Sequence, residues 1–308
     1  MNKKALNLKV KGFFIIFVNM NGVIILSLKK YAYYQAAANL AMSIKHFNKN
    51  INITLVSDGV HNEHFRAEHY AYFDWIKEID ELDFNDDYGF SPALAKINIY
   101  KYSTYDNTLY IDSDTLVLQD IQPLIDNLVS LEGNFYSNVL GSGGFSDDIR
   151  YQAWATNQKL WDYFKLDKEQ KIYTFNTSWF FFRNNSENIF KRVYNNYFSG
   201  FSKLDLKNKW GGSLPDELFF YGTLAQLNIN PTVNFDVCFF GENVDSRSLD
   251  ELEKQHYMFT LYGGRSTVRL IYREWYDRLC HMMCARNGLN HYFKSDNILK
   301  DKHVNNAN

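Results

Sequence analysis

The chain has 308 residues, enough for one large domain or two modest ones, and its 46% hydrophobic and 17% aromatic content excludes a disordered protein. The formal net charge of −2 provides no basic surface for nucleic acid, so we predict no nucleic-acid partner. Three cysteines are too few for a disulfide framework and are typical of a reducing compartment. We therefore expect a cytoplasmic protein.

The N-terminal segment has lysines followed by a short apolar run at 13–18, a layout that resembles a signal peptide. No small-residue cleavage site follows, and the run is shorter than the ~20 residues that a membrane span needs. Translation starting at Met20 is an alternative. We expect residues 1–21 to be a tail, 22–285 one domain and 286–308 a second tail, with no integral membrane span. A basic, aromatic stretch near the C-terminus leaves peripheral contact with the inner membrane open.

From residue 22 the chain alternates between strand and helix patterns. Continuous apolar runs predict strands buried on both faces, and apolar residues at helical spacing predict amphipathic helices. We expect strands at 23–28, 51–57 and 76–82, and helices at 34–47, 63–75 and 92–100, the last capped by Ser91. This order predicts right-handed βαβ units, and hence an α/β fold with one mostly parallel sheet and helices on both faces.

Two carboxylates interrupt the next apolar run, at 109–118. Asp112 and Asp114 are two residues apart, so on an extended strand both side chains point to the same side. Burying two like charges is costly unless a positive group compensates for them, and a hard divalent cation bound through oxygen is suited to this role. Ligands of open α/β sheets bind at the carboxyl ends of the strands. We therefore predict that Asp112 and Asp114 bind Mn²⁺ or Mg²⁺.

Beyond residue 120 the alternation is looser. We expect helices at 121–129, 151–164, 189–198, 216–226 and 268–283, strands at 134–140, 177–183 and 257–262, and a flexible loop at 141–144. No internal repeat or linker divides this part from the first, so the sequence predicts one continuous domain.

Taken in order, these features resemble the GT-A glycosyltransferases, most closely the retaining glycosyltransferase family 8 of glycogenin-like and bacterial galactosyltransferase-like proteins. The resemblance covers about residues 22–275. In that family an Asp-x-Asp motif, matched here by Asp112-Ser113-Asp114, binds the metal that holds the diphosphate of a nucleotide sugar. The resemblance implies a GT-A fold and a metal-dependent hexosyltransferase, with a UDP-sugar favoured as donor and a glycan, lipid or protein hydroxyl as acceptor.

The resemblance also implies a donor site along the strand ends. Tyr31 lies where the family places residues near the base and ribose, and Lys96 lies where it places a basic residue near the phosphates. Ser27, Asp58 and Ser113 complete the predicted donor-binding set. An ordinary loop tyrosine and a solvated helix lysine are the alternative interpretations of Tyr31 and Lys96.

Three further residues match family positions around the transferred sugar. Asn176 lies near that sugar in the family, and Asp216 corresponds to an aspartate that binds its hydroxyls. Glu217 stands where the family has a glutamine, and a carboxylate there could act as a nucleophile or as a base. The alternative is that the two acidic residues only complement the dipole at the start of a helix.

The C-terminal match is incomplete. The family has a histidine as third metal ligand, whereas here the nearest histidine is His256, further upstream, so His256 or a water completes the predicted metal site. Arg265 or Arg269 takes the diphosphate role of the family's lysine, because arginine suits bidentate phosphate contacts.

Three other functions remain open. An inverting enzyme would use Glu217 or Asp216 as its base. A sugar-phosphate nucleotidyltransferase has a related sheet, but no glycine-rich phosphate loop follows the first strand here. A protein that binds a nucleotide sugar or glycan without turnover is the third possibility, because fold does not determine function.

Overall fold

The structure is a computed structural model, and it describes residues 20–87, 89–143, 150–151, 155–200, 204, 214–234, 237–240, 254–261, 270–286, 288 and 294–295. Its centre is a six-stranded sheet with the order β3-β2-β1-β6-β13-β8. These strands are β1 (Asn21–Ser27), β2 (Asn52–Ser57), β3 (Trp75–Glu78), β6 (Asn107–Asp112), β8 (Phe135–Tyr136) and β13 (Trp179–Arg183). The first four run parallel to one another, and β13 pairs antiparallel with both β6 and β8. The prediction of a mostly parallel sheet is confirmed.

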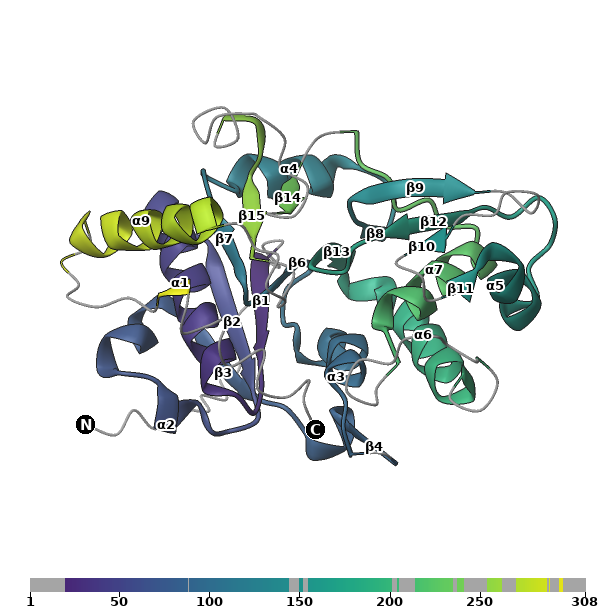
Figure 1. The fold of residues 1–308 in the computed structure, drawn as a ribbon, viewed down its shortest axis with the longest axis horizontal. Coiled ribbons are helices and arrows are strands. Elements are labelled where there is room, and N and C mark those ends of the chain that lie inside the picture. The colour runs from purple at the N-terminus through teal and green to yellow at the C-terminus, as the bar shows by residue number, and fades with distance from the viewer. Residues whose placement is uncertain are drawn as a thin grey trace, which may run out of the picture.

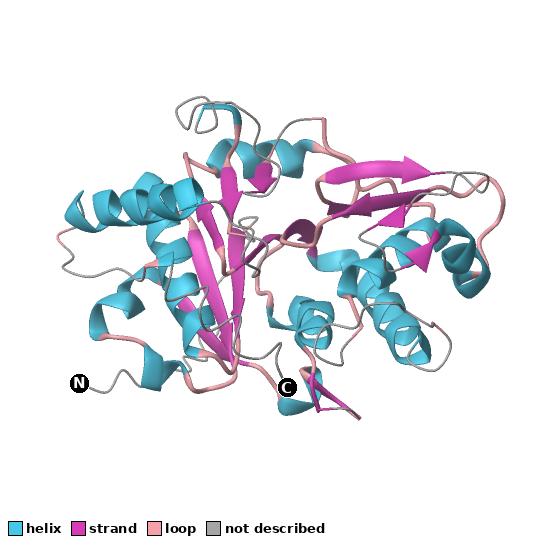
Figure 2. Cartoon of the chain, viewed as in Figure 1, coloured by secondary structure: helices cyan, strands magenta, loops and turns pink. Residues whose placement is uncertain are grey.

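Helices cover both faces of this sheet, as predicted (Figures 1 and 2). The helices of the described residues are α1 (Tyr31–Phe47), α2 (His61–His64), α3 (Pro92–Asn98), α4 (Gln122–Ser130), α5 (Asn157–Phe164), α6 (Glu187–Gly200), α7 (Asp216–Gln226) and α9 (Leu270–Arg286). Alternate residues of β1 supply two separate cores. Val23 and Ile25 pack with residues of α1 and α9, whereas Ile24 packs with residues of α3, α6 and α7. The continuous apolar run therefore follows from burial on both faces.

The second core is held together by closely packed aromatic rings. Phe135 stacks on both Phe180 and Phe220, which are tilted to each other, and the three ring centroids lie 5.5–5.6 Å apart. Helix α7 approaches α5 so closely at Gly222 that a Cβ atom there would lie 2.1 Å from the ring of Phe164. Among the residues that the structure describes, no helix is long and apolar enough to cross a bilayer.

The prediction of one helix over residues 63–75 is wrong. The chain instead forms α2, an extended link and the short 3₁₀ helix η1 (Ala67–Tyr72) before it enters β3. Phe65 lies in the link and stacks on Phe73, with ring centroids 5.5 Å apart and an interplanar angle of 11°. A continuous helix would not bring these two rings face to face, so tertiary packing overrides the helical pattern.

The region after residue 130 also differs from the prediction. The predicted strand at 134–140 divides into β8 and β9 (Val139–Gly143), so the expected glycine loop is in part a strand, which pairs with β12 (Ile172–Phe175). Helix α5 begins at Asn157 because the preceding residues form the small strands β10 (Arg150–Tyr151) and β11 (Ala155–Thr156). Other short elements are β4 (Asn85–Asp86), β5 (Gly89–Phe90), η2 (Glu81–Asp83), η3 (Ile99–Tyr102) and η4 (Asn184–Ser186).

Candidate active site

The Asp-x-Asp segment lies where the chain passes from one sheet to another. Asp112 is the last residue of β6 and pairs with Leu26 of β1, while β7 (Thr115–Val117) begins after Asp114 and joins β14 (Cys238–Phe240) and β15 (Met258–Thr260) in a second sheet. The backbone oxygen of Asp114 accepts a hydrogen bond from the N–H of Leu261 at 2.9 Å. The Asp-x-Asp motif therefore lies at a strand end, as predicted. Asp112 ends β6, whereas Asp114 lies in the turn that follows, at the carboxyl edge of the central sheet.

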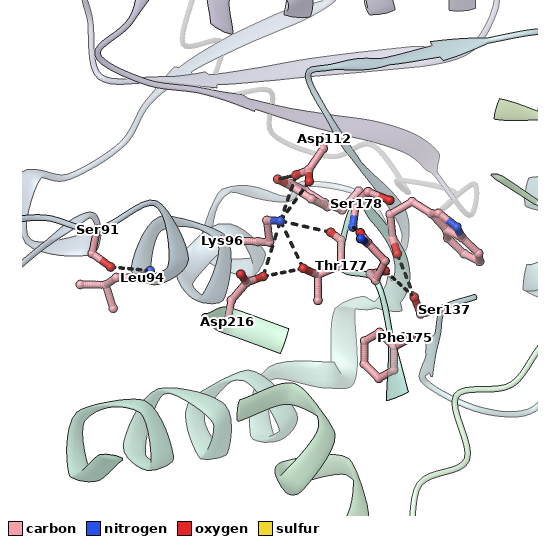
Figure 3. Close-up of polar contacts among 12 residues, drawn as sticks. Ser91, Leu94, Lys96, Asp112, Ser137, Phe175, Thr177, Ser178 and Asp216 are labelled. Atoms are coloured by element: carbon pink, nitrogen blue, oxygen red, sulfur yellow. Dashed lines mark hydrogen bonds and ion pairs between the residues drawn. The ribbon is translucent and has the colours of Figure 1, made fainter. Parts of the chain in front are cut away.

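Lys96 lies at the centre of a largely buried polar cluster, which we call the Lys96 cluster (Lys96, Asp112, Thr177 and Asp216; Figure 3). Its ammonium nitrogen is 3.1 Å from a carboxylate oxygen of Asp112 and 3.5 Å from Oδ2 of Asp216. The same nitrogen donates to the backbone oxygen and the hydroxyl of Thr177, at 3.2 and 3.3 Å. With a side chain only 13% exposed, Lys96 is not a solvated helix lysine.

Burial and charge shift the pKa values in this cluster. Burial alone would lower the pKa of Lys96, but the carboxylates of Asp112 and Asp216 raise it well above its usual range. Burial raises the pKa of Asp112, with a contribution from the nearby charge of Asp114, while Lys96 opposes the shift. The ammonium group therefore stays charged and partly neutralises a site that is otherwise acidic.

Sequence reasoning missed two members of the site. The hydroxyl of Tyr110 donates to Oδ1 of Asp112 at 2.5 Å, and its ring lies 5.6 Å from the Lys96 nitrogen. The hydroxyl of Thr177 donates to Oδ2 of Asp216 at 2.6 Å. The strand period could have identified Tyr110, which precedes Asp112 by two residues on the same face of β6. Thr177 is adjacent to the predicted Asn176 and has no signal of its own.

The first turn of α7 brings the predicted acidic pair to this cluster. Asp216 points toward Lys96 and Thr177, as Figure 3 shows. Glu217 is buried, and burial, followed by the charge of Asp216, raises its pKa well above the usual range, with Lys96 opposing the shift. A carboxyl group with a raised pKa holds its proton at higher pH than an exposed glutamate does.

The side chain of Asn176 makes a hydrogen bond within its own turn. Its side-chain oxygen accepts a hydrogen bond from the N–H of Ser178 at 2.7 Å, which closes the turn between β12 and β13. The hydroxyl of Ser137 donates to the backbone oxygens of Asn176 and Trp179 at 3.4 and 3.0 Å. Asn176 thus fixes the turn that carries Thr177 into the Lys96 cluster.

The predicted nucleoside-binding residues lie at neighbouring strand ends. Ser27 ends β1 and is buried, Tyr31 begins α1 and is 45% exposed, and Asp58 follows β2. Since β1 lies between β2 and β6, these residues share the sheet edge with Asp112. Ser113 is buried in the Asp-x-Asp turn. A cavity of about 660 Å³ opens beside Asp58, with Lys29, Glu78 and Phe84 in its lining.

The structure does not bring His256 to the acidic pair. In the antiparallel pairing of β15 with β7, Thr260 lies opposite Thr115, next to Asp114, whereas the backbone oxygen of His256 accepts a hydrogen bond from Gln119 at the other end of the ladder. Arg265 and Arg269 lie outside the described residues.

The candidate metal ligands at this edge are the carboxylates of Asp112 and Asp114, without a histidine. Among the residues that the structure describes, no group of three or more His, Cys, Asp or Glu side chains is arranged to hold a metal ion. Two carboxylates close enough for the charge of one to raise the pKa of the other nevertheless suit a hard cation, which can take its other ligands from phosphates and water.

Comparison with known proteins identifies the fold. No protein-family model matches the sequence, and no curated protein matches it. Two solved structures of LgtC do. One is an active-site mutant in which Glu replaces Gln; it is 14% identical, with a TM-score of 0.55 over 91% of this chain and 100% of its own. The other is a galactosyltransferase complex with donor and acceptor sugar analogues; it is 15% identical, with a TM-score of 0.55 over 89% of this chain and 98% of its own.

The fold is that of a GT-A glycosyltransferase. The bifunctional glycosyltransferase WbbM also matches, with 15% identity and a TM-score of 0.51 over 82% of this chain and 47% of its own. The resemblance in fold that the motif order predicted is therefore confirmed.

Proposed function

We propose that this protein is a metal-dependent glycosyltransferase that moves a sugar from a nucleotide-sugar donor, preferably a UDP-sugar, to a hydroxyl of a glycan, lipid or protein, with retention of configuration. The observation that carries the proposal is the Lys96 cluster, in which one buried ammonium joins Asp112 of β6 to Asp216 of α7 at the ligand-binding edge of a GT-A sheet. A cytoplasmic location remains a prediction from the cysteine content.

Asp112 and Asp114 are the residues that would hold Mn²⁺ or Mg²⁺. When bound, such a cation neutralises the charge that develops on a leaving nucleoside diphosphate. Lys96 keeps the Asp112 carboxylate in place and adds a second positive charge at the same edge. Asp216, fixed by the Thr177 hydroxyl, is positioned to accept hydrogen bonds from a sugar. Ser27, Tyr31, Asp58 and Ser113 lie on the nucleoside side of this arrangement.

Glu217 separates two versions of the chemistry. As a base or nucleophile it must be ionised, yet its burial raises its pKa and favours the neutral carboxyl group. A neutral carboxyl group donates a hydrogen bond, as a glutamine side chain does, which supports a role in orienting the sugar. The Glu217→Gln variant therefore keeps most of its activity if Glu217 orients the sugar, and loses it if Glu217 is a nucleophile or the base of an inverting enzyme.

A panel of UDP- and GDP-sugars with Mn²⁺ tests the proposal. We expect metal-dependent transfer or slow hydrolysis of at least one nucleotide sugar, with the anomer of the product read by NMR. Asp112→Asn and Asp114→Asn should reduce the rate, while Asp106→Asn, a surface aspartate bonded to Asn184, serves as a matched control. Pyrophosphate release from a nucleoside triphosphate and a sugar phosphate would instead indicate a nucleotidyltransferase, and binding without turnover a binding protein.

A further inference from the structure

The turn between β1 and α1 contains a residue in an unfavourable backbone conformation. Lys29 has φ +63°, in the left-handed region that side chains with a Cβ atom rarely adopt. The turn is tight, since the N–H of Lys30 donates to the backbone oxygen of Leu28 at 2.7 Å. Such a conformation persists only where the surrounding structure enforces it.

Asp58, which follows β2, contacts this residue twice. Oδ2 of Asp58 accepts a hydrogen bond from the N–H of Lys29 at 3.0 Å and lies 3.7 Å from the Lys29 ammonium nitrogen. Oδ1 accepts a hydrogen bond from the hydroxyl of Tyr34, and the side chain is only 2% exposed. Both carboxylate oxygens are therefore engaged within the protein, where Asp58 contacts the turn and α1.

Asp58 is in turn fixed by a chain of hydroxyl contacts. The hydroxyl of Tyr34 lies 2.9 Å from Oγ of Ser57, and the same Oγ lies 2.9 Å from Nδ1 of His61. The N–H of Gly59 also donates to this Oγ, at 3.2 Å. Tyr34 and Ser57 are fully buried, so the contact between their hydroxyls is shielded from water.

The same tyrosine also supports the residue that follows the turn. The ring of His64 lies 5.0 Å from the ring of Tyr34 and 5.3 Å from the ring of Tyr31. Tyr31 is 45% exposed at the sheet edge, so a ligand can reach one side of its ring, while His64 contacts the ring within the protein.

We propose that Tyr34, Ser57, Asp58 and His61 form a positioning chain that holds the 28–31 turn in its left-handed conformation and so places Tyr31 at the nucleoside end of the donor site. This inference rests on the proposed function. It assigns to Asp58 a role in arranging the donor site rather than in contacting the donor.

The test compares two buried tyrosines that each lose one hydroxyl. Tyr34→Phe removes the link between Ser57 and Asp58. Tyr105→Phe removes a buried contact of 2.8 Å with Thr54, which also lies on β2 but is not part of the positioning chain. Titration calorimetry with UDP and with GDP, in the presence of Mn²⁺, gives the dissociation constants. We expect the constant to rise about 5- to 20-fold for Tyr34→Phe and less than 2-fold for Tyr105→Phe, with kcat at saturating donor unchanged in both.

Amide exchange at Lys29 provides a readout that needs no ligand. We expect at least 10-fold faster exchange at this amide in Tyr34→Phe, and unchanged exchange in Tyr105→Phe. Equal dissociation constants for the two variants, or unchanged exchange at Lys29 in Tyr34→Phe, would overturn the inference. If the unaltered protein binds neither nucleotide, the proposed function fails. The role of the positioning chain in placing Tyr31 for a donor then fails too, even if the exchange result shows that the positioning chain stabilises the turn.

A second background tests the cause. Glycine adopts the left-handed conformation without a Cβ clash, so a turn with Lys29→Gly depends less on its supports. In that background Tyr34→Phe should raise the dissociation constant less than 2-fold, and Asp58→Asn, used if Tyr34→Phe does not fold, should show the same reduced effect. An effect as large as with Lys29 present would contradict the proposed mechanism.

Discussion

Two buried polar groups flank β1 at the same edge of the sheet, and they are built on different principles. The Lys96 cluster is charged, with one ammonium between two carboxylates, whereas the positioning chain consists mainly of hydroxyl contacts that end on Asp58. Removing the ammonium from the first leaves buried carboxylates without a counter-charge. Removing a hydroxyl from the second costs about one hydrogen bond. A site that stabilises charge is therefore the more fragile of the two.

The largest expected effect tests that fragility directly. Lys96→Met should lower the free energy of unfolding by about 3–5 kcal/mol, because it leaves the largely buried Asp112 and Asp216 without their shared cation. Lys101→Met is the control, since Lys101 is 40% exposed and its pair with Asp83 is worth about 1 kcal/mol or less. Urea denaturation measures both. A similar loss of unfolding free energy in the two variants would contradict the expected cost of leaving Asp112 and Asp216 without a cation.

A smaller loss is expected where the cluster loses a neutral member. Thr177→Val keeps the shape of the side chain but removes the hydroxyl that donates to Asp216 at 2.6 Å. We expect the free energy of unfolding to fall by about 1–3 kcal/mol and kcat to fall as well, since Asp216 loses its fixed orientation. Unchanged kcat with lower stability would show that the Thr177 contact is structural only.

The positioning chain should tolerate the loss of a hydroxyl better than the Lys96 cluster tolerates the loss of its ammonium group. Ser57→Ala removes contacts to Tyr34 and His61 without leaving a charge unpaired, so we expect the free energy of unfolding to fall by about 0.5–1.5 kcal/mol. A destabilisation as large as that of Lys96→Met would contradict the expected difference between the two groups. Thermal unfolding at one protein concentration provides the ranking.

The smallest effect is a pH dependence of stability at His61, the last member of the positioning chain. Burial lowers the pKa of His61, while Glu78 and Asp58 partly oppose the shift. The unfolded state then binds a proton more readily than the folded state, so this contribution to stability is complete above about pH 6.5 and declines as the pH falls below it.

His61→Gln should therefore flatten the decline in the free energy of unfolding between pH 7 and 5.5. Burial, and then Arg286, lower the pKa of His46 as well, so His46→Gln should flatten a separate part of the same decline. An unaltered slope in His61→Gln would show that this imidazole titrates normally.

The alternating part of the sequence predicted the fold well, because each strand and crossover helix is encoded over a short stretch. The apolar run of β1 and the N-cap Ser91, whose hydroxyl accepts from the N–H of Leu94, are local features of this kind. The helix expected over 63–75 failed because Phe65 and Phe73 stack on each other, a contact that local periodicity does not contain.

The site was predictable where chemistry and strand order agreed. Lys96, Asp112 and Asp216 come together as the resemblance implied, since each lies on a predicted element at one edge of the sheet. The engagement of Asp58 with Tyr34 and the distance of His256 from Asp114 depend on pairing between distant segments. Strand register decides such contacts, and one sequence does not specify it.

The acidic pair of α7 also depends on a residue that has no side chain. Gly222 lies six positions after Asp216, about 9 Å along the helix axis, and its hydrogen faces the ring of Phe164 with no room for a methyl group. A helix moves as a rigid rod, so a bulkier residue at 222 would tilt the whole of α7 and swing Asp216 away from Lys96. The position of the Asp216 carboxylate thus depends on how tightly α7 packs against α5 at Gly222.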